Sequence, residues 1–182
     1  TFGEEQVGLY QLIFPFYALC LSLSTSGLET AISRSVSRFH SLGRTQDGKL
    51  IFKTGLILSV LISLICTFLV QENSVFLSNR FLGDPRCAAL LYLIVLALPA
   101  ASVHSCICGY HYGLQSTSVP AISQLLEQFV RISSVFVLYF IFLHSGVHPE
   151  ISLAVSGIIF GEFAAAGYSL FSLKKRCFDA DS

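Results

Sequence analysis

The segment Gly109–Ser134 reads GYHYGLQSTSVPAISQLLEQFVRISS, and it decides how the rest of the chain is interpreted. It restarts at Pro120 after a turn rich in small and aromatic residues, and it continues into the almost wholly apolar run Ile132–Leu143. Polar residues recur within it at spacings of three and four, which places them on one face of a helix. They are Gln124, Glu127, Gln128, Arg131 and Ser134. A helix with such a stripe and an apolar end suits neither water nor lipid on all sides. We therefore predict a membrane helix whose polar stripe faces a helix bundle or a water-filled cavity.

The composition of the whole chain indicates a membrane protein. Of its 182 residues, 53% are hydrophobic and 12% are charged, whereas ordinary soluble domains carry about 25% charged residues. The formal net charge is zero, which argues against a nucleic-acid partner held by bulk electrostatics. The chain opens at TFGEEQ without an initiator methionine, and we expect it to be a fragment of a longer protein.

Five hydrophobic stretches are long enough to cross a bilayer, whose hydrocarbon core of about 30 Å needs roughly 20 apolar residues in a helix. We predict an all-α, polytopic transmembrane bundle with spans at about 7–30, 50–70, 87–112, 120–143 and 151–173. Pro15 and Pro99 should kink the first and third spans, because proline removes a helical hydrogen bond. Pro120 suits the first turn of the fourth span.

Positive charge orients these spans. The segment 31–49 and the start of the second span carry the densest positive charge of the chain, at Arg34, Arg38, Arg44, Lys49 and Lys53. The positive-inside rule places the loop 31–49 in the cytoplasm, together with the tail 174–182. The segment 71–86, which contains turn residues, and the short turn 144–150 are then predicted to lie outside as loops.

Two pairs of glycines are spaced four residues apart. Gly109 and Gly113 end the third span, and Gly157 and Gly161 lie in the fifth span with Ala165 one turn further on. Small residues at this spacing allow the backbones of two membrane helices to approach closely. We predict that both pairs serve helix packing.

Three charged residues are predicted to meet near the middle of the membrane. With a rise of about 1.5 Å per residue, Glu127 lies roughly 10 Å and Arg131 roughly 16 Å from Pro120, and Glu162 lies roughly 16 Å from the start of its span. Arg131 and Glu162 should therefore lie at similar depth on consecutive antiparallel helices. A charge at the bilayer centre costs about 3 kcal/mol, so these groups must be paired or hydrated. Their expected hydrogen-bonding neighbours are Gln124 and Gln128.

Two interpretations of these charges remain open. Arg131 could bind an anionic head group, because a guanidinium matches phosphate geometry, while Glu162 could hold the arginine in place or carry a coupling proton. Alternatively, the cluster is a buried ion pair that only fixes the helix register. Near the end of the first span, Arg34 and Arg38 could contact phosphates at the inner mouth of a cavity, or could only set the topology.

Other chemistries have little support in the sequence. Cys106-x-Cys108 has His104 and His111 nearby, but these ligands fall on different faces of a helix and no second pair matches them, so we expect no metal or other cofactor. His104 lies well inside a span, where we expect it to pack or hydrogen-bond. Because no Ser-His-Asp order, glycine-rich phosphate loop or metalloprotease motif is present, we do not expect an enzyme.

Two stretches resemble a known family. Residues 8–39, GLYQLIFPFYALCLSLSTSGLETAISRSVSRF, are similar to the second transmembrane segment of bacterial polysaccharide-biosynthesis exporters. Residues 108–132 carry G-x-x-x-G, Pro-Ala-x-Ser-Gln and Glu-Gln-x-x-Arg, and they resemble the junction of the fourth and fifth helices in that family. The similarity is to the stage V sporulation protein B type, with the lipid II flippases as relatives. All belong to the multidrug/oligosaccharidyl-lipid/polysaccharide exporter superfamily.

The resemblance implies a protein of twelve to fourteen helices in two lobes around a cavity, of which this chain would be most of the first lobe. The implied activity is the movement of an undecaprenyl-pyrophosphate-linked oligosaccharide or peptidoglycan precursor across the bacterial plasma membrane by alternating access. The implied partners are the lipid bilayer, this lipid-linked glycan, a coupling proton or sodium ion, and the missing helices. Family flippases also use arginines in their first helix and second lobe, and these are absent here. The alternatives are a cation-coupled multidrug extruder and a membrane scaffold that transports nothing.

Overall fold

The structure, a computed structural model, describes residues 4–144 and 152–180. Every described element is a helix, which confirms the predicted all-α class. The elements are α1 (Glu4–Ser41), α2 (Thr45–Glu72), α3 (Ser74–Leu77), the π-helix η1 (Ser78–Leu82), α4 (Cys87–Ile94), α5 (Ala97–Gly113), α6 (Ser118–His144) and α7 (Ser152–Ala180). Five stretches are long and apolar enough to cross a membrane: Gly8–Ser41, Thr45–Glu72, Cys87–Gly113, Ser118–Phe142 and Leu153–Lys174.

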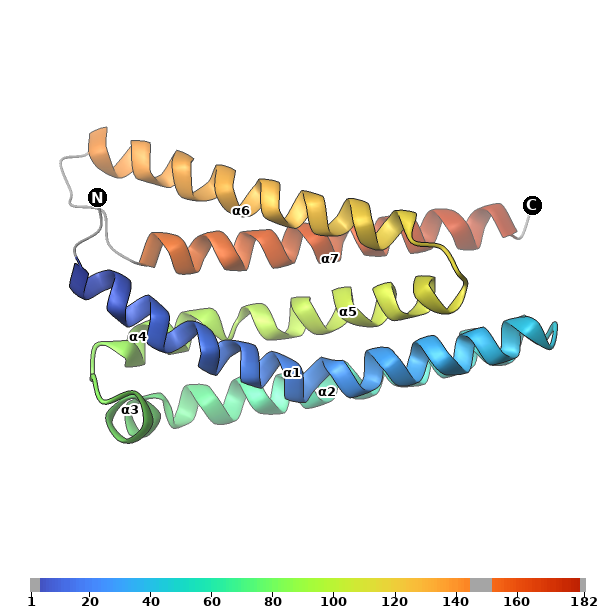
Figure 1. The fold of residues 1–182 in the computed structure, drawn as a ribbon, viewed down its shortest axis with the longest axis horizontal. Helices are drawn as coiled ribbons and strands as arrows, with labels where there is room; N and C mark the ends of the chain where they lie inside the picture. The colour runs from blue at the N-terminus through green and yellow to red at the C-terminus, as the bar shows by residue number, and fades with distance from the viewer. Residues whose placement is uncertain (1–3, 145–151, 181–182) are drawn as a thin grey trace.

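The long helices lie side by side, with α6 at one edge of the bundle (Figure 1). α1 packs against α2 and α5, α5 packs against α7, and α7 packs along α6. Contacts between α6 and α5 are far fewer. α6 is therefore supported mainly from one side, and much of its surface is left to lipid, solvent or further helices.

The short connection between α1 and α2 lies where the sequence predicts a cytoplasmic loop. α1 continues as a helix to Ser41 and α2 begins at Thr45, so most of the segment 31–49 is helical. Gly43 turns the chain with a positive φ of 72°. The guanidinium of Arg44 lies 2.7 Å from the carboxylate of Asp47 on the first turn of α2. The side of the membrane on which this turn lies stays a prediction.

The segment 71–86 differs from the predicted loop. α2 extends to Glu72, and α3 and η1 continue the helical path to Leu82, so a turn remains only around Gly83, where φ is 74°. Ser74 and Ser78 are buried in this segment, while its large apolar side chains at Val75, Phe76 and Phe81 are exposed. The packing of this helical segment through its small serines therefore overcomes the preference of its turn-forming residues for a loop. The outer turn predicted at 144–150 lies almost entirely outside the described residues.

Proline causes the break between α4 and α5. Pro99 has no N–H to donate to the carbonyl of Val95, four residues earlier, and its ring disfavours a regular helix at that carbonyl. The helix is interrupted at Val95 and Leu96, and Figure 1 shows α4 and α5 as separate helices. The hydroxyl of Thr67 on α2 donates to the Val95 carbonyl at 3.1 Å. A neighbouring helix thus supplies the hydrogen bond that the proline removes.

The same face of α2 carries further small polar residues. Ser59 donates to the Ser24 carbonyl of α1 at 3.3 Å, and the Ser63 hydroxyl lies 3.1 Å from the Ser102 hydroxyl of α5. These side chains are buried. Small hydroxyl residues let membrane helices approach closely while their polar atoms find partners.

The two glycine pairs serve close packing, as predicted. A Cβ added at Gly109 would lie 2.7 Å from the Glu29 carbonyl of α1, and one at Gly113 would lie 2.7 Å from the Ser33 carbonyl. On α7, a Cβ at Gly157 would lie 2.6 Å from a Val135 methyl of α6. These glycines therefore fix how closely α5 approaches α1 and how closely α7 approaches α6.

Candidate functional site: a charged pocket between four helices

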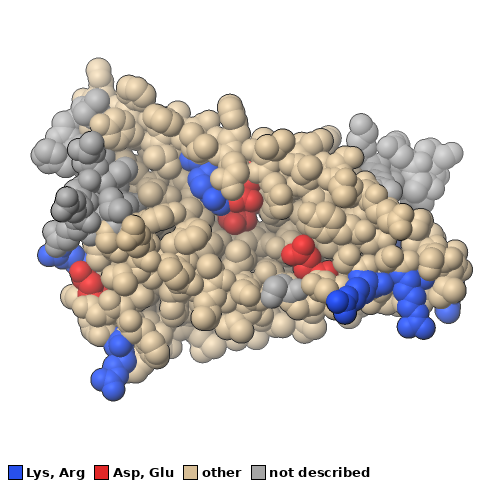
Figure 2. Space-filling view, in the orientation of Figure 1, with Lys and Arg blue, Asp and Glu red and all other residues tan. Residues whose placement is uncertain are grey.

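A pocket of about 290 Å³ opens between α1, α5, α6 and α7. In the space-filling view, basic and acidic atoms lie together in a hollow near the middle of the face (Figure 2). The pocket has an apolar wall on α1, formed by Phe14, Ala18 and Leu21. Its polar lining is Tyr17, His104, Ser105, Gln124, Glu127, Arg131 and Glu162.

Glu127 and Arg131 form an ion pair within α6. They are one helical turn apart, and a terminal nitrogen of Arg131 donates to Oε1 of Glu127. The other terminal nitrogen donates to Oε1 of Gln128 at 3.4 Å. The side chains of Arg131 and Glu127 are 26% and 12% exposed. The buried Nε of Arg131 finds no acceptor among the described residues, so one donor of the guanidinium is left without a hydrogen bond.

Glu162 reaches the pocket from α7 because its neighbour Gly161 packs on the α6 backbone. A Cβ at Gly161 would lie 3.1 Å from the Glu127 carbonyl and 3.3 Å from Cβ of Arg131. Glu162 itself is only 6% exposed, and it accepts a hydrogen bond of 3.4 Å from the hydroxyl of Tyr17 on α1. The pocket thus holds two carboxyl groups and one guanidinium.

His104 on α5 lies next to these charged groups. It is 7% exposed, and its Nε2 lies 2.9 Å from the hydroxyl of Ser123 on α6. This bears out the expectation that His104 hydrogen-bonds inside its span. His104, Glu127 and Glu162 offer ligand atoms that all lie within 4.8 Å of one another. By donor type these three could hold a cation, although the nearby guanidinium of Arg131 opposes its charge.

The cysteines near His104 lie apart from this three-residue set. Cys106 and Cys108 are buried free thiols, and Sγ of Cys108 lies 3.9 Å from the Ser123 hydroxyl. His111, one of the other residues considered in the sequence, has Nδ1 2.9 Å from the Ile107 carbonyl. Its ring therefore bonds to its own helix at that atom.

The structure brings together most of the residues that the sequence singles out. Glu127, Arg131 and Glu162 meet in one pocket, which Gln124 also lines, and Gln128 bonds to Arg131. Arg34 and Arg38 are exposed near the end of α1 and do not line this pocket. Tyr17 was not among the predicted residues, and His104 was predicted only to pack or hydrogen-bond. Neither residue carries a local pattern that would have pointed to the pocket.

Comparison with known proteins places the chain in a family. The model of the family described as "Polysaccharide biosynthesis protein" matches residues 1–180. The chain belongs to this family. As a family member with five apolar helical stretches, it is a multi-pass membrane protein.

Three curated family relatives come from Bacillus subtilis (strain 168). Stage V sporulation protein B is 34% identical over 96% of this chain and 34% of its own length. The lipid II flippase MurJ is 25% identical over 93% of this chain and 30% of its own length. The uncharacterized membrane protein YabM is 24% identical over 95% of this chain and 32% of its own length. The chain thus spans about a third of the length of these relatives. No solved structure matches it.

Proposed function

We propose that this chain is part of a flippase that moves a polyprenyl-pyrophosphate-linked oligosaccharide or peptidoglycan precursor across the bacterial plasma membrane. The observation that carries the proposal is the pocket, in which Arg131, Glu127 and Glu162 gather between four membrane helices. Charge inside a membrane is costly and commonly marks a substrate or ion path. The relative named as a lipid II flippase supports the same class of substrate. The proposed activity is transport, with no bond made or broken.

Arg131 is the proposed contact for the pyrophosphate. A guanidinium offers several donors in a fixed plane that matches phosphate oxygens. Two of its nitrogens are already bonded to Glu127 and Gln128, while Nε has no acceptor among the described residues. A phosphate oxygen would reach the buried Nε only after a shift of the side chain, and it would then complete the hydrogen bonding of the guanidinium. Gln124, which lines the same pocket, is a proposed further donor to the head group.

Glu162 and His104 are the proposed site for a coupling proton or sodium ion. With Glu127, their ligand atoms lie within 4.8 Å of one another. The two carboxylates outnumber the single guanidinium of Arg131, so one bound positive charge would balance the cluster. Binding of that charge could then bias the protein between an inward-open and an outward-open state.

Alternating access needs a second set of helices around the cavity, which the rest of a longer protein would supply. The exposed face of α6 and the open side of the pocket are suited to such helices. Arg34 and Arg38 remain proposed contacts for substrate phosphates at the inner mouth, since both are exposed at the basic end of α1.

A cation-coupled multidrug extruder is the second candidate. Phe14 and Tyr17 give the pocket an aromatic wall, and its carboxylates outnumber its guanidinium, which would suit an organic cation. A scaffold in which the Glu127–Arg131 pair is only structural is the third candidate, and the pairing of both residues within one helix favours it.

Reconstitution separates these candidates. The full-length protein in proteoliposomes would be given a fluorescent polyprenyl-pyrophosphate-linked sugar in one set and an organic cationic dye in another. The flippase proposal expects movement of the lipid-linked sugar and no uptake of the dye. Dye uptake alone would support the extruder, and movement of neither compound in sealed vesicles with folded protein would support the scaffold.

A further inference from the structure

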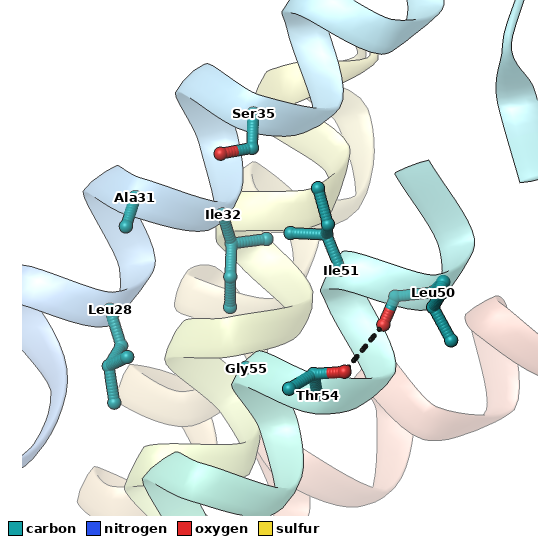
Figure 3. Close-up of a pocket in the computed structure, with 8 residues that line it drawn as sticks. All are labelled: Leu28, Ala31, Ile32, Ser35, Leu50, Ile51, Thr54 and Gly55. Carbon is teal, nitrogen blue, oxygen red and sulfur yellow. Dashed lines mark hydrogen bonds between the residues drawn. The ribbon is translucent and has the colours of Figure 1, made fainter. Parts of the chain in front are cut away.

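A second hollow, of about 310 Å³, lies between α1 and α2 (Figure 3). Its walls are aliphatic, and the side chains that form them are Leu28, Ala31, Ile32, Leu50 and Ile51. Ser35, Thr54 and Gly55 complete the lining. From Leu28 to Ser35 the hollow follows α1 for roughly 10 Å, at a rise of about 1.5 Å per residue. It is a groove long enough to hold part of a hydrocarbon chain.

Small residues keep the groove open. It stays apolar because the hydroxyl of its threonine is hydrogen-bonded within its own helix. A Cβ added at Gly55 would lie 2.8 Å from the end of the Ile32 side chain, so the glycine leaves room that Ile32 partly uses. Ala31 is exposed and adds only a methyl group to the wall. The Thr54 hydroxyl donates to the Leu50 carbonyl of its own helix at 3.0 Å, as the dashed line in Figure 3 shows. Thr54 therefore needs no polar partner in the groove.

Basic residues surround the end of the bundle where the groove lies. Five basic residues fall between positions 34 and 53, whereas two acidic residues lie near the groove: Asp47, which is paired with Arg44, and the half-buried Glu29, which follows Leu28. Lys53 is exposed and directly precedes Thr54 of the lining, and Arg34 is exposed and directly precedes Ser35. Basic side chains also gather toward this end of the face in Figure 2. An apolar groove beside an excess of positive charge is complementary to an anionic amphiphile.

We propose that this groove binds one acyl chain of an anionic phospholipid, whose phosphate is held by Lys53 and the neighbouring basic residues. Clusters of basic residues next to a membrane helix attract anionic lipids, and each contributes about fivefold to binding near the surface. The apolar walls add the burial of the chain itself. The site is separate from the charged pocket, and it does not depend on the proposed transport function.

Native mass spectrometry of the purified full-length protein tests the site. The protein in detergent would be titrated with phosphatidylglycerol or with phosphatidylcholine of the same acyl chains. We expect phosphatidylglycerol to be retained more strongly. Ala31→Trp, which fills the groove, should abolish the difference, whereas Ala121→Trp, at an exposed alanine of α6, should keep it. Lys53→Gln should weaken phosphatidylglycerol binding about fivefold, and Arg80→Gln, at an exposed arginine of η1, should leave it unchanged.

Three results would overturn the proposal. The first is equal retention of both lipids by the wild-type protein. The second is unchanged retention in Ala31→Trp, which would mean that phosphatidylglycerol binds elsewhere on the protein. The third is displacement of phosphatidylglycerol by a polyprenyl phosphate at equal concentration, which would assign the groove to a substrate tail. If Ala31→Trp does not fold, as judged by its elution profile, Thr54→Phe fills the same groove from α2 and carries the same expectation.

Discussion

Replacement of Arg131 by glutamine should destabilise the bundle because the repulsion between two neighbouring carboxylates is then no longer offset by a positive charge. Glu127 and Glu162 offer oxygens within 4.8 Å of each other. At an effective dielectric constant of about 20, two like charges at that separation repel by about 3.5 kcal/mol. Because the Arg131 side chain is 26% exposed, solvent screens part of this repulsion. We therefore expect Arg131→Gln to lower the free energy of unfolding by about 2–3 kcal/mol.

A second substitution makes the electrostatic origin of this loss testable. Glu162→Gln in the Arg131→Gln background removes one of the two opposed charges, so it should restore about 2 kcal/mol or more of the lost stability. By itself Glu162→Gln should cost less than Arg131→Gln, because a glutamine oxygen can still accept the hydrogen bond of Tyr17. Unfolding in mixed micelles with increasing SDS, followed by far-UV circular dichroism, measures all three variants. Equal instability of the single Arg131→Gln variant and the double variant would refute the charge argument and indicate that Arg131 acts through packing.

Three further predictions follow from the fold. Thr67→Val should lower the free energy of unfolding by about 1 kcal/mol, measured by the same SDS titration. In a Pro99→Ala background this loss should be smaller, because the alanine N–H can donate to the Val95 carbonyl that otherwise depends on Thr67. An equal loss in both backgrounds would contradict this explanation of the Thr67 hydrogen bond. Gly157→Leu should lower the free energy of unfolding by about 1–3 kcal/mol, because the new side chain clashes with a valine of α6. Gly167→Leu should have little effect, because no atom lies within 4 Å of its added Cβ. Equal effects of the two substitutions would mean that close packing of α6 on α7 does not limit stability. A cysteine placed in the turn 42–44 should react with an impermeant maleimide only in inside-out vesicles, and labelling in right-side-out cells would reverse the predicted orientation.

The sequence predicts the helices well because their signals are local. Long apolar runs define the membrane-crossing stretches, and the three- and four-residue spacing of Glu127 and Arg131 places them on one face of α6. The predicted meeting with Glu162 depends only on helical rise and on the antiparallel order of two consecutive helices. The structure brings these groups into one pocket.

Residues that reach the pocket from other helices could not be predicted in this way. Tyr17 comes from α1 and His104 from α5, far from α6 in the sequence. Their positions depend on how four helices pack, which no short spacing encodes. The helix break caused by Pro99 also lies away from the residue that causes it, because the carbonyl that loses its hydrogen bond belongs to Val95, four residues earlier. The helical path through residues 74–82 could not be predicted in this way, because the turn-forming residues are a local signal whereas the burial of Ser74 and Ser78 depends on packing.

The most direct test of the proposed role of the pocket is a transport assay with the full-length protein in proteoliposomes. It would measure the movement of a polyprenyl-pyrophosphate-linked sugar by the wild-type protein, by Arg131→Gln and Glu162→Gln, and by the control variant Lys174→Gln. Reconstituted amounts and elution profiles of the variants would be matched first. We predict at least a tenfold loss of transport in both pocket variants and wild-type transport in Lys174→Gln, whose exposed charge lies outside the pocket. Wild-type transport in both pocket variants would contradict the proposed role of the pocket and leave the charges with a structural role.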